Sequence, residues 1–284
     1  MKLPGYNSHF PRLTIAIMDF TVSLSPNDQV VLSRYEAAFF PKFRVIFEGT
    51  RSERSFEFLA QPPDEAETAV VMENRADKDV TALRYYWVMT GGDGNVRRHT
   101  VSSDSYMVDV YHPVLRVKDR KLICRSVTVD ESLIDHVLSG GGSMGCRIGS
   151  GTQSLAGVAS LQLEIDMLLF ADGELAGPDT NKFAAELRGR KPAAEFVAKQ
   201  IRLAEAEGRD VTPVLSALAE IPSLGRPGHA KGDPLVHWTR RYAREYLQAA
   251  GRRIGDLDMQ GTKLRHLENR PSLPRFYRAE PGTH

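Results

Sequence analysis

Apolar and polar residues alternate most regularly between Leu161 and Met167. Positions 161, 163, 165 and 167 are apolar, and the three positions between them are polar. This two-residue period predicts a strand with one buried and one solvent-facing side. The apolar run 168–170 then breaks the alternation, which predicts burial on both sides or a bulge, and Asp172-Gly173 predicts a tight turn.

A second alternating stretch runs from Val80 to Thr90. Leu83, Tyr85, Trp87 and Met89 fall on one side of it, so we expect all four in a hydrophobic core. Further strands are predicted over residues 13–20, 55–58, 68–73, 96–102, 106–110 and 121–129, and residues 44–48 are expected to be extended. Short strands at regular spacing, punctuated by Gly, Asn and Asp, favour an antiparallel sandwich over a parallel sheet with crossover helices.

Part of this pattern resembles a known architecture. A polar turn at residues 74–79, followed by the strand that carries Trp87, is similar to immunoglobulin-like and fibronectin-like modules, over about residues 55–175. The resemblance implies an immunoglobulin-like β-sandwich that follows an irregular N-terminal segment. The Cys–Trp–Cys order of antibody domains is absent, because Cys124 and Cys146 both follow Trp87.

The hydrophobic period becomes that of a helix after residue 180. One stripe holds Phe183, Leu187, Ala194, Val197, Ile201 and Ala204. Asp179 or Thr180 can accept hydrogen bonds at the helix start, and Pro192 predicts a kink or two helices placed end to end. Further helices are predicted over residues 212–220, 234–251 and 262–269, the second with Leu235, Trp238, Tyr242 and Tyr246 on one stripe.

The strand pattern and the helix pattern meet at a change in charge. Residues 1–179 hold 18 Lys and Arg against 24 Asp and Glu, a balance of −6, and residues 180–284 hold 19 against 12, a balance of +7. We therefore predict an α+β protein, with a β-sandwich domain over residues 1–178 and an α-helical region over residues 179–284. Because amphipathic helices need a partner surface, we expect the basic helical region to pack on the acidic sandwich.

Composition excludes several classes of protein. No apolar run reaches the ~20 residues that cross a bilayer, and residues 1–20 lack the apolar centre of a signal peptide. The chain is therefore expected in the cytoplasm by default, or it is a mature form whose export leader was removed, and no membrane span is expected. Two cysteines that form no Cys-x-x-Cys pair exclude a structural zinc site. They favour two reduced thiols over the single disulfide that an exported protein could form, and we predict no cofactor.

The loop 141–145 matches G-x-S-x-G, the nucleophile elbow of α/β-hydrolases, with Ser143 at its centre. The elbow requires a strand before the motif and a helix after it, and neither flank has that pattern here. A flexible Gly/Ser loop is therefore favoured over a catalytic Ser143. As a nucleophile, Ser143 would need His229 or His237 as its base.

Two carboxylates, Glu164 and Asp166, share one side of the 161–167 strand, as an acid and base pair can. Because they alternate with apolar residues, a solvent-facing side explains them without chemistry.

Five arginines gather in and after the 234–251 helix, at Arg240, Arg241, Arg244, Arg252 and Arg253. With aromatic residues nearby, such a cluster can contact an anionic surface or nucleic acid. The pI of about 7.8 and the lack of a nucleic-acid-binding motif favour a solvated helix face instead.

The sequence therefore favours a non-enzymatic protein that acts through contacts with another protein. The alternatives are a serine hydrolase that uses Ser143, and a binder of anions or nucleic acid that uses the arginine cluster. The fold cannot choose among them, because sandwiches carry unrelated functions.

Overall fold

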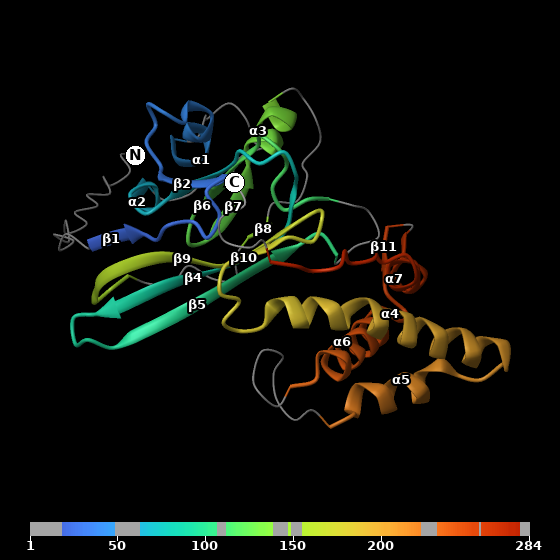
Figure 1. Cartoon of the computed structure of the whole chain (residues 1–284). Helices are drawn as coiled ribbons and strands as arrows, with labels where there is room; N and C mark the ends of the chain where they lie inside the picture. The colour runs from blue at the N-terminus through green and yellow to red at the C-terminus, as the bar shows by residue number, and fades with distance from the viewer. Residues whose placement is uncertain are drawn as a thin grey trace, which may run out of the picture.

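The computed structural model describes residues 19–48, 63–106, 112–138, 147–148, 155–222, 232–255 and 257–278. The protein is α+β, with two β-sheets in the first part of the chain and most of its helices in the last part (Figure 1). The predicted α+β class is therefore confirmed. The strands predicted over residues 13–18, 55–58 and 107–110 lie outside the described residues, and Tyr106 lies in a turn.

The first sheet is built around β9, which spans Val158–Phe170 and contains the predicted 161–167 strand. Its strand order is β1-β9-β4-β5, and β10 pairs with the end of β9. The other strands are β1 (Asp19–Val22), β4 (Val80–Gly91), β5 (Val96–Asp104) and β10 (Leu175–Ala176). Their pairings are antiparallel, except that β1 runs parallel to β9.

The second sheet has the strand order β2-β3-β6-β7-β8, and every pairing in it is antiparallel. Its strands are β2 (Val30–Arg34), β3 (Val70–Asn74), β6 (Arg120–Ile123), β7 (Val127–Asp130) and β8 (Arg147–Ile148). The single strand predicted over 121–129 is wrong, because β6 and β7 form a hairpin. The turn at 124–126 contains neither Gly nor Pro, and its one turn-forming residue, Ser126, is a weak signal.

One hydrophobic cluster lies between the two sheets. Leu83, Tyr85, Trp87 and Met89 of β4 meet Leu161, Leu163 and Ile165 of β9 and Val70, Met72 and Ile123 of the second sheet. The predicted burial of these β4 and β9 positions is therefore confirmed. Met167 is also buried, but it lies in the cluster on the other side of the sheet, because the register with β4 shifts between Ile165 and Met167. The two sheets share this core without closing into a barrel.

The other side of the second sheet is covered by short helices. They are a 3₁₀ turn at Pro41–Phe43, α1 (Arg44–Glu48), α2 (Pro63–Ala66) and α3 (Glu131–Leu138). Phe43 and Ile46 are buried there against Leu122 and Val129. The expectation that residues 44–48 are extended is wrong, because they form α1. A helical backbone places residues three positions apart on one side, so Phe43 and Ile46 can both be buried.

The helical region consists of α4 (Phe183–Ala206), α5 (Val211–Glu220), α6 (Pro234–Ala249) and α7 (Met259–Glu268), with a short hairpin of β11 (Arg253–Ile254) and β12 (Leu257–Asp258). Asp210, Asp233 and Asp258 cap α5, α6 and α7 through their side chains. The N-cap of α5 is therefore Asp210 and not the predicted Thr212, so the helix begins at Val211. No helix in these ranges is long and apolar enough to cross a membrane.

Pro192 lies inside α4, which continues through it as one helix. The alternative of two helices placed end to end is therefore wrong. Pro192 and Arg188 are both exposed, so water can reach the Arg188 carbonyl that loses its usual donor. The predicted stripe, from Phe183 to Ala204, is buried on the opposite side of the helix.

The start of α4 packs on the outer side of the first sheet. Phe183 and Leu187 share a hydrophobic cluster with Met167 and Leu169 of β9. Figure 1 shows α4 leaving the sheet at this point and running beside α6. The helices approach closely at Gly189, where an added Cβ would lie 2.6 Å from the Cβ of Pro234.

The first prediction concerns the core. Trp87 is 1% exposed between the sheets, so Trp87→Ala should lower the free energy of unfolding by ~3–5 kcal/mol in urea denaturation. Leu24→Ala is the control, because Leu24 is 94% exposed and its replacement should change stability by less than about 0.5 kcal/mol. A loss below about 1 kcal/mol for Trp87→Ala would contradict this packing.

The second prediction concerns the contact between α4 and α6. Gly189→Ala should destabilise the protein by ~1–3 kcal/mol, because its new methyl group would clash with Pro234. Gly92→Ala is the matched control, since its Cβ would meet nothing within 4 Å. Equal thermal unfolding midpoints for the two variants would show that the helices are not held this closely.

Candidate protein-contact surface

The residues proposed for a hydrolase are only partly described. Ser143 and His229 lie outside the described residues, whereas His237 lies in the first turns of α6 and is partly buried. The ring of His237 meets Trp238 edge to face, with centroids 5.3 Å apart. Because the proposed nucleophile lies outside the described residues, the hydrolase hypothesis stays a prediction.

The pKa of His237 is lowered from its ordinary value. Burial is the largest cause, and the charges of Arg240 and Arg241 lower it further, while Glu186 of α4 opposes them. Burial and the two arginines both disfavour the imidazolium. The ring is therefore held in its neutral form at neutral pH.

Two of the five clustered arginines bond within the helical region. Arg240 and Arg244 both donate to the carbonyl oxygen of Ala219, at 3.5 and 3.0 Å. This carbonyl lies in the last turn of α5, where the helix dipole favours positive charge. These side chains therefore join α6 to α5 and do not reach the acidic sheets.

The other three arginines are separated from this contact. Arg241 pairs with Glu245 at 2.8 Å, one turn away on α6. Arg252 and Arg253 are exposed beside the short β11 hairpin. Of the five residues predicted as a partner-binding cluster, two therefore bond to α5, one pairs within α6, and two are exposed at the β11 hairpin.

Other ion pairs join the helices to the first sheet. Arg84 of β4 pairs with Glu186 of α4 at 2.9 Å, and Arg190 of α4 pairs with Asp104 of β5. The four side chains are at most 14% exposed. Arg84 belongs to the acidic sheet region and Arg190 to the basic helical region. The difference in net charge between the two regions therefore did not predict these pairs. Their only signal in the sequence is the four-residue spacing of Glu186 and Arg190.

Asp166 occupies a bulge in β9. Arg84 lies opposite Met167 and Tyr85 lies opposite Ile165, so Asp166 has no partner in the register with β4. It is 2% exposed, which contradicts the solvent-facing side expected for it. Glu164, two residues earlier, faces solvent as expected and pairs with Arg98 at 3.5 Å.

The Asp166 carboxylate accepts three hydrogen bonds. The Tyr86 hydroxyl donates at 2.9 Å, and the backbone N–H and hydroxyl of Thr180 donate at 2.9 and 2.6 Å. Asn181 donates to the Tyr86 oxygen at 2.6 Å. This buried network holds the turn before α4 in place, which explains the burial of Asp166 without a catalytic role.

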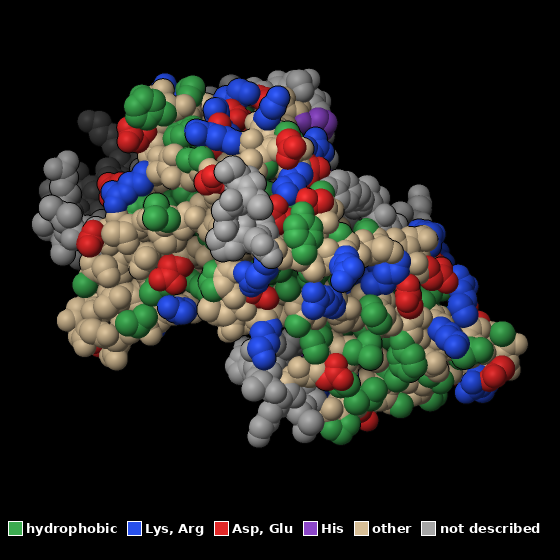
Figure 2. Space-filling model, viewed as in Figure 1, with side chains coloured by type: hydrophobic (Ala, Val, Ile, Leu, Met, Phe, Trp, Pro, Cys, Tyr) green, Lys and Arg blue, Asp and Glu red, His purple; other side chains and the backbone are tan. Residues whose placement is uncertain are grey.

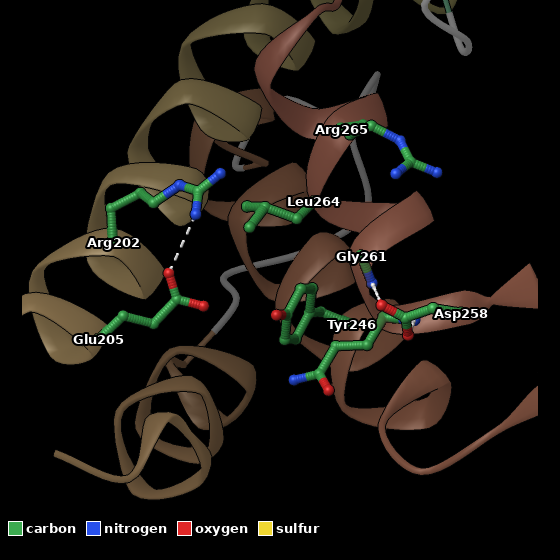
Figure 3. Close-up of a pocket in the computed structure, with 8 residues that line it drawn as sticks. Arg202, Glu205, Tyr246, Asp258, Gly261, Leu264 and Arg265 are labelled. Carbon is green, nitrogen blue, oxygen red and sulfur yellow. Dashed lines mark hydrogen bonds and ion pairs between the residues drawn. The ribbon is translucent and has the colours of Figure 1, made fainter. Parts of the chain in front are cut away.

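A hollow of about 360 Å³ lies beside α4, α6 and α7 (Figure 3). Arg202 and Glu205 line it from α4 and form an ion pair at 3.1 Å. On the opposite side the Asp258 carboxylate accepts a hydrogen bond from the Gly261 N–H at 3.0 Å. Because these polar groups bond one another, the hollow offers them less readily to a ligand.

Large apolar side chains are exposed along one side of α4. Phe196 and Leu203 are each 42% exposed, and Pro192 is also exposed. Residues spaced by four and seven positions line up on a helix, so these three residues share one side of α4, which we call the α4 face. The exposed Lys199 lies between Phe196 and Leu203 on this side. Figure 2 shows hydrophobic side chains gathered over α4 and its neighbour α5.

The packing of α4 within the chain uses its opposite side. Val197 and Ile201 are fully buried in a cluster with Trp238 and Tyr242 of α6. The α4 face therefore contributes little to this core, although it presents large apolar groups to water. Such a side of a fixed helix is typical of a protein-contact surface.

In the described ranges, no three His, Cys, Asp or Glu side chains are placed to hold a metal ion. Asp130 at the end of β7 and Asp135 within α3 both form ion pairs. Lys42 lies 2.8 Å from Asp135, and Lys121 lies 2.6 Å from Asp130.

The third prediction concerns pH. Because the pKa of His237 is lower in the folded protein than in the unfolded chain, the unfolded chain binds more protons in this range. The contribution of His237 to the free energy of unfolding is present in full above about pH 6.5, the pKa of a histidine in the unfolded chain. It is lost as the pH falls from there towards the lower pKa of His237 in the folded protein. His237→Gln should therefore show a smaller loss of unfolding free energy between pH 7.5 and 5.5 than the natural chain does. Equal slopes would mean that this histidine is not shifted.

Comparisons with known proteins give no information on what the α4 face binds. No family model matches the chain, and no curated protein or solved structure matches it. What the surface binds is therefore argued from its side chains alone.

Proposed function

We propose that the protein is a non-enzymatic interaction module that contacts another protein through the α4 face. The observation that carries the proposal is the alignment of Phe196 and Leu203, which α4 presents on the side away from its own core. Burying the exposed part of each side chain would contribute roughly 1 kcal/mol. A partner with a complementary apolar strip fits this surface.

The rest of the chain serves in this proposal as a rigid support. Two mostly antiparallel sheets that share one core agree with a sandwich of the immunoglobulin-like kind, and we keep that kinship as part of the proposal. Sandwiches of this kind carry unrelated binding sites. The buried pairs Arg84–Glu186 and Arg190–Asp104 hold α4 on the support.

The fourth prediction tests the α4 face. A double variant, Phe196→Glu with Leu203→Glu, places two carboxylates where the partner's apolar strip would bury them, and glutamate keeps a good helix propensity. The tagged full-length chain is incubated with a lysate of its source organism, and captured proteins are quantified by mass spectrometry. We expect at least one protein to be captured by the natural chain and reduced about 10-fold or more by the double variant.

Leu24→Glu is the matched control, because Leu24 is a highly exposed apolar residue outside the α4 face. It should retain the captured protein. Circular dichroism of all three chains checks that the helices are intact. Capture that the double variant retains at the natural level would exclude the α4 face as the contact surface.

A further inference from the structure

Strand β5 forms one edge of the first sheet. Its nine residues pair with β4 in an unbroken register, from Thr90 opposite Val96 to Ala82 opposite Asp104. In the described part of the chain no strand pairs with its other side. Figure 1 shows β5 along the margin of the sheet, with α4 near its C-terminal end.

The hydrogen bonds at the two ends of the β4–β5 pair determine which main-chain groups point outwards. The Gly91 N–H donates to the Asn95 carbonyl at 2.8 Å, and the Ser105 N–H donates to the Thr81 carbonyl at 2.8 Å. In an antiparallel pair, bonded and non-bonded residue pairs alternate. Residues 97, 99, 101 and 103 therefore bond to β4, whereas Val96, Arg98 and Thr100 direct their N–H and C=O groups away from it.

Only the first half of this edge is open. Val96 is 59% exposed, and Arg97, Arg98 and Thr100 are exposed as well. At the other end, Asp104 is covered by its ion pair with Arg190 of α4. The open edge, residues 96–100, is long enough for a short extended segment to pair with it.

The open edge has few of the features that protect sheet edges. Proteins shorten edge strands, interrupt them with bulges or place Pro in them. β5 has nine residues, no Pro and no register shift, whereas the edge strands β1 and β2 have four and five residues. Its only protective feature is positive charge, at Arg97 and Arg98.

These charges select among the strands that can pair here. In a two-fold symmetric pair of β5 strands, the registers centred on Arg97 or Arg98 place two guanidinium groups opposite each other, which is destabilising. An acidic residue opposite Arg98 is instead favourable, because the Arg98 side chain is 55% exposed and its existing pair with Glu164 is long, at 3.5 Å.

A hollow of about 720 Å³ adjoins the open edge at its N-terminal end. It is lined by the β4–β5 turn, by Val96 and Arg97, and by Gly157 before β9. An antiparallel segment would pass Thr100 first and Val96 last. The residue that faces Val96 would therefore lie at the mouth of this hollow. An apolar side chain is favoured there because it would cover the exposed Val96 side chain.

We propose that residues 96–100 of β5 bind an extended segment of a partner protein by antiparallel strand addition, with an acidic residue opposite Arg98 and an apolar residue opposite Val96. Main-chain hydrogen bonds supply the affinity of such a contact and alternate side chains supply its specificity. This is a second contact surface, made by different residues from the α4 face.

The fifth prediction uses synthetic peptides. The probe is a fluorescein-labelled peptide with the core Thr-Val-Glu-Val-Ile between Gly-Ser flanks, and the control peptide has Lys in place of Glu. Fluorescence anisotropy with the full-length chain should show tighter binding of the Glu peptide, by about 2- to 5-fold. Arg98→Glu should reverse this preference.

A main-chain variant distinguishes strand addition from simple charge attraction. Thr100→Pro removes an N–H that points away from β4, so the fold should tolerate it while peptide binding falls about 10-fold or more. Thr100→Ala keeps the N–H and should bind within about 2-fold of the natural chain. Peptide addition should also slow amide hydrogen exchange at Arg98 and Thr100.

Three outcomes would overturn the proposal. They are no binding of either peptide to the natural chain at millimolar concentration, natural affinity in Thr100→Pro, or an unchanged preference in Arg98→Glu. The double variant Phe196→Glu with Leu203→Glu should bind the Glu peptide like the natural chain. The experiments therefore distinguish failure of the proposal for the α4 face from failure of the proposal for the β5 edge.

Discussion

Asp166 sits in a bulge of β9, where its carboxylate accepts hydrogen bonds from Tyr86 and Thr180 and its backbone carbonyl accepts one from Asp179. These bonds hold the turn that leads from the first sheet into α4. The turn also requires Gly177, whose φ is +94° and whose added Cβ would lie 2.4 Å from the Asp166 carbonyl oxygen. The position of α4, and with it the helical region, depends on this buried network.

Apolar and charged contacts have different roles where α4 meets the sheet. The cluster of Phe183 and Leu187 with Met167 and Leu169 supplies the stabilising burial. Two ion pairs beside it, Arg84–Glu186 and Arg190–Asp104, are nearly buried, and burying charges offsets most of the attraction between them. Because breaking either pair would leave an uncompensated charge, the pairs specify one orientation of the helix more than they stabilise it.

The same helix sets the positions of both proposed contact surfaces. Its first turns cover the C-terminal half of β5 through Arg190, which leaves only residues 96–100 of that edge open. Its later turns bury Val197 and Ile201 against α6 and turn Phe196 and Leu203 outwards. A partner that engages both surfaces would therefore meet them at a fixed spacing, which suits binding of two linked segments.

Local periodicity determined much of the fold. The alternation in β4 and β9 identified the side of each strand that faces the core between the sheets, but it did not show that β4 is buried on both sides from Val80 to Met89. The 3.6-residue stripe from Phe183 to Ala204 identified the buried side of α4, because such periods follow from backbone geometry. Short segments were less predictable. Residues 44–48 form a helix, and residues 121–129 divide into a hairpin, because contacts with the rest of the chain outweigh weak local preferences there.

The surfaces could not be read from the sequence in the same way. Arg240 and Arg244 formed the clearest cluster in the chain, and the tertiary structure directs them to a carbonyl of α5. Asp166 occurred in a regular alternation, and only the bulge in β9 turned it inwards. Sequence alone determined the class of fold and the buried sides of its long elements, because those depend on local periods. The sheet edge left open and the helix side left exposed were decided by tertiary packing, because each depends on which distant element covers it.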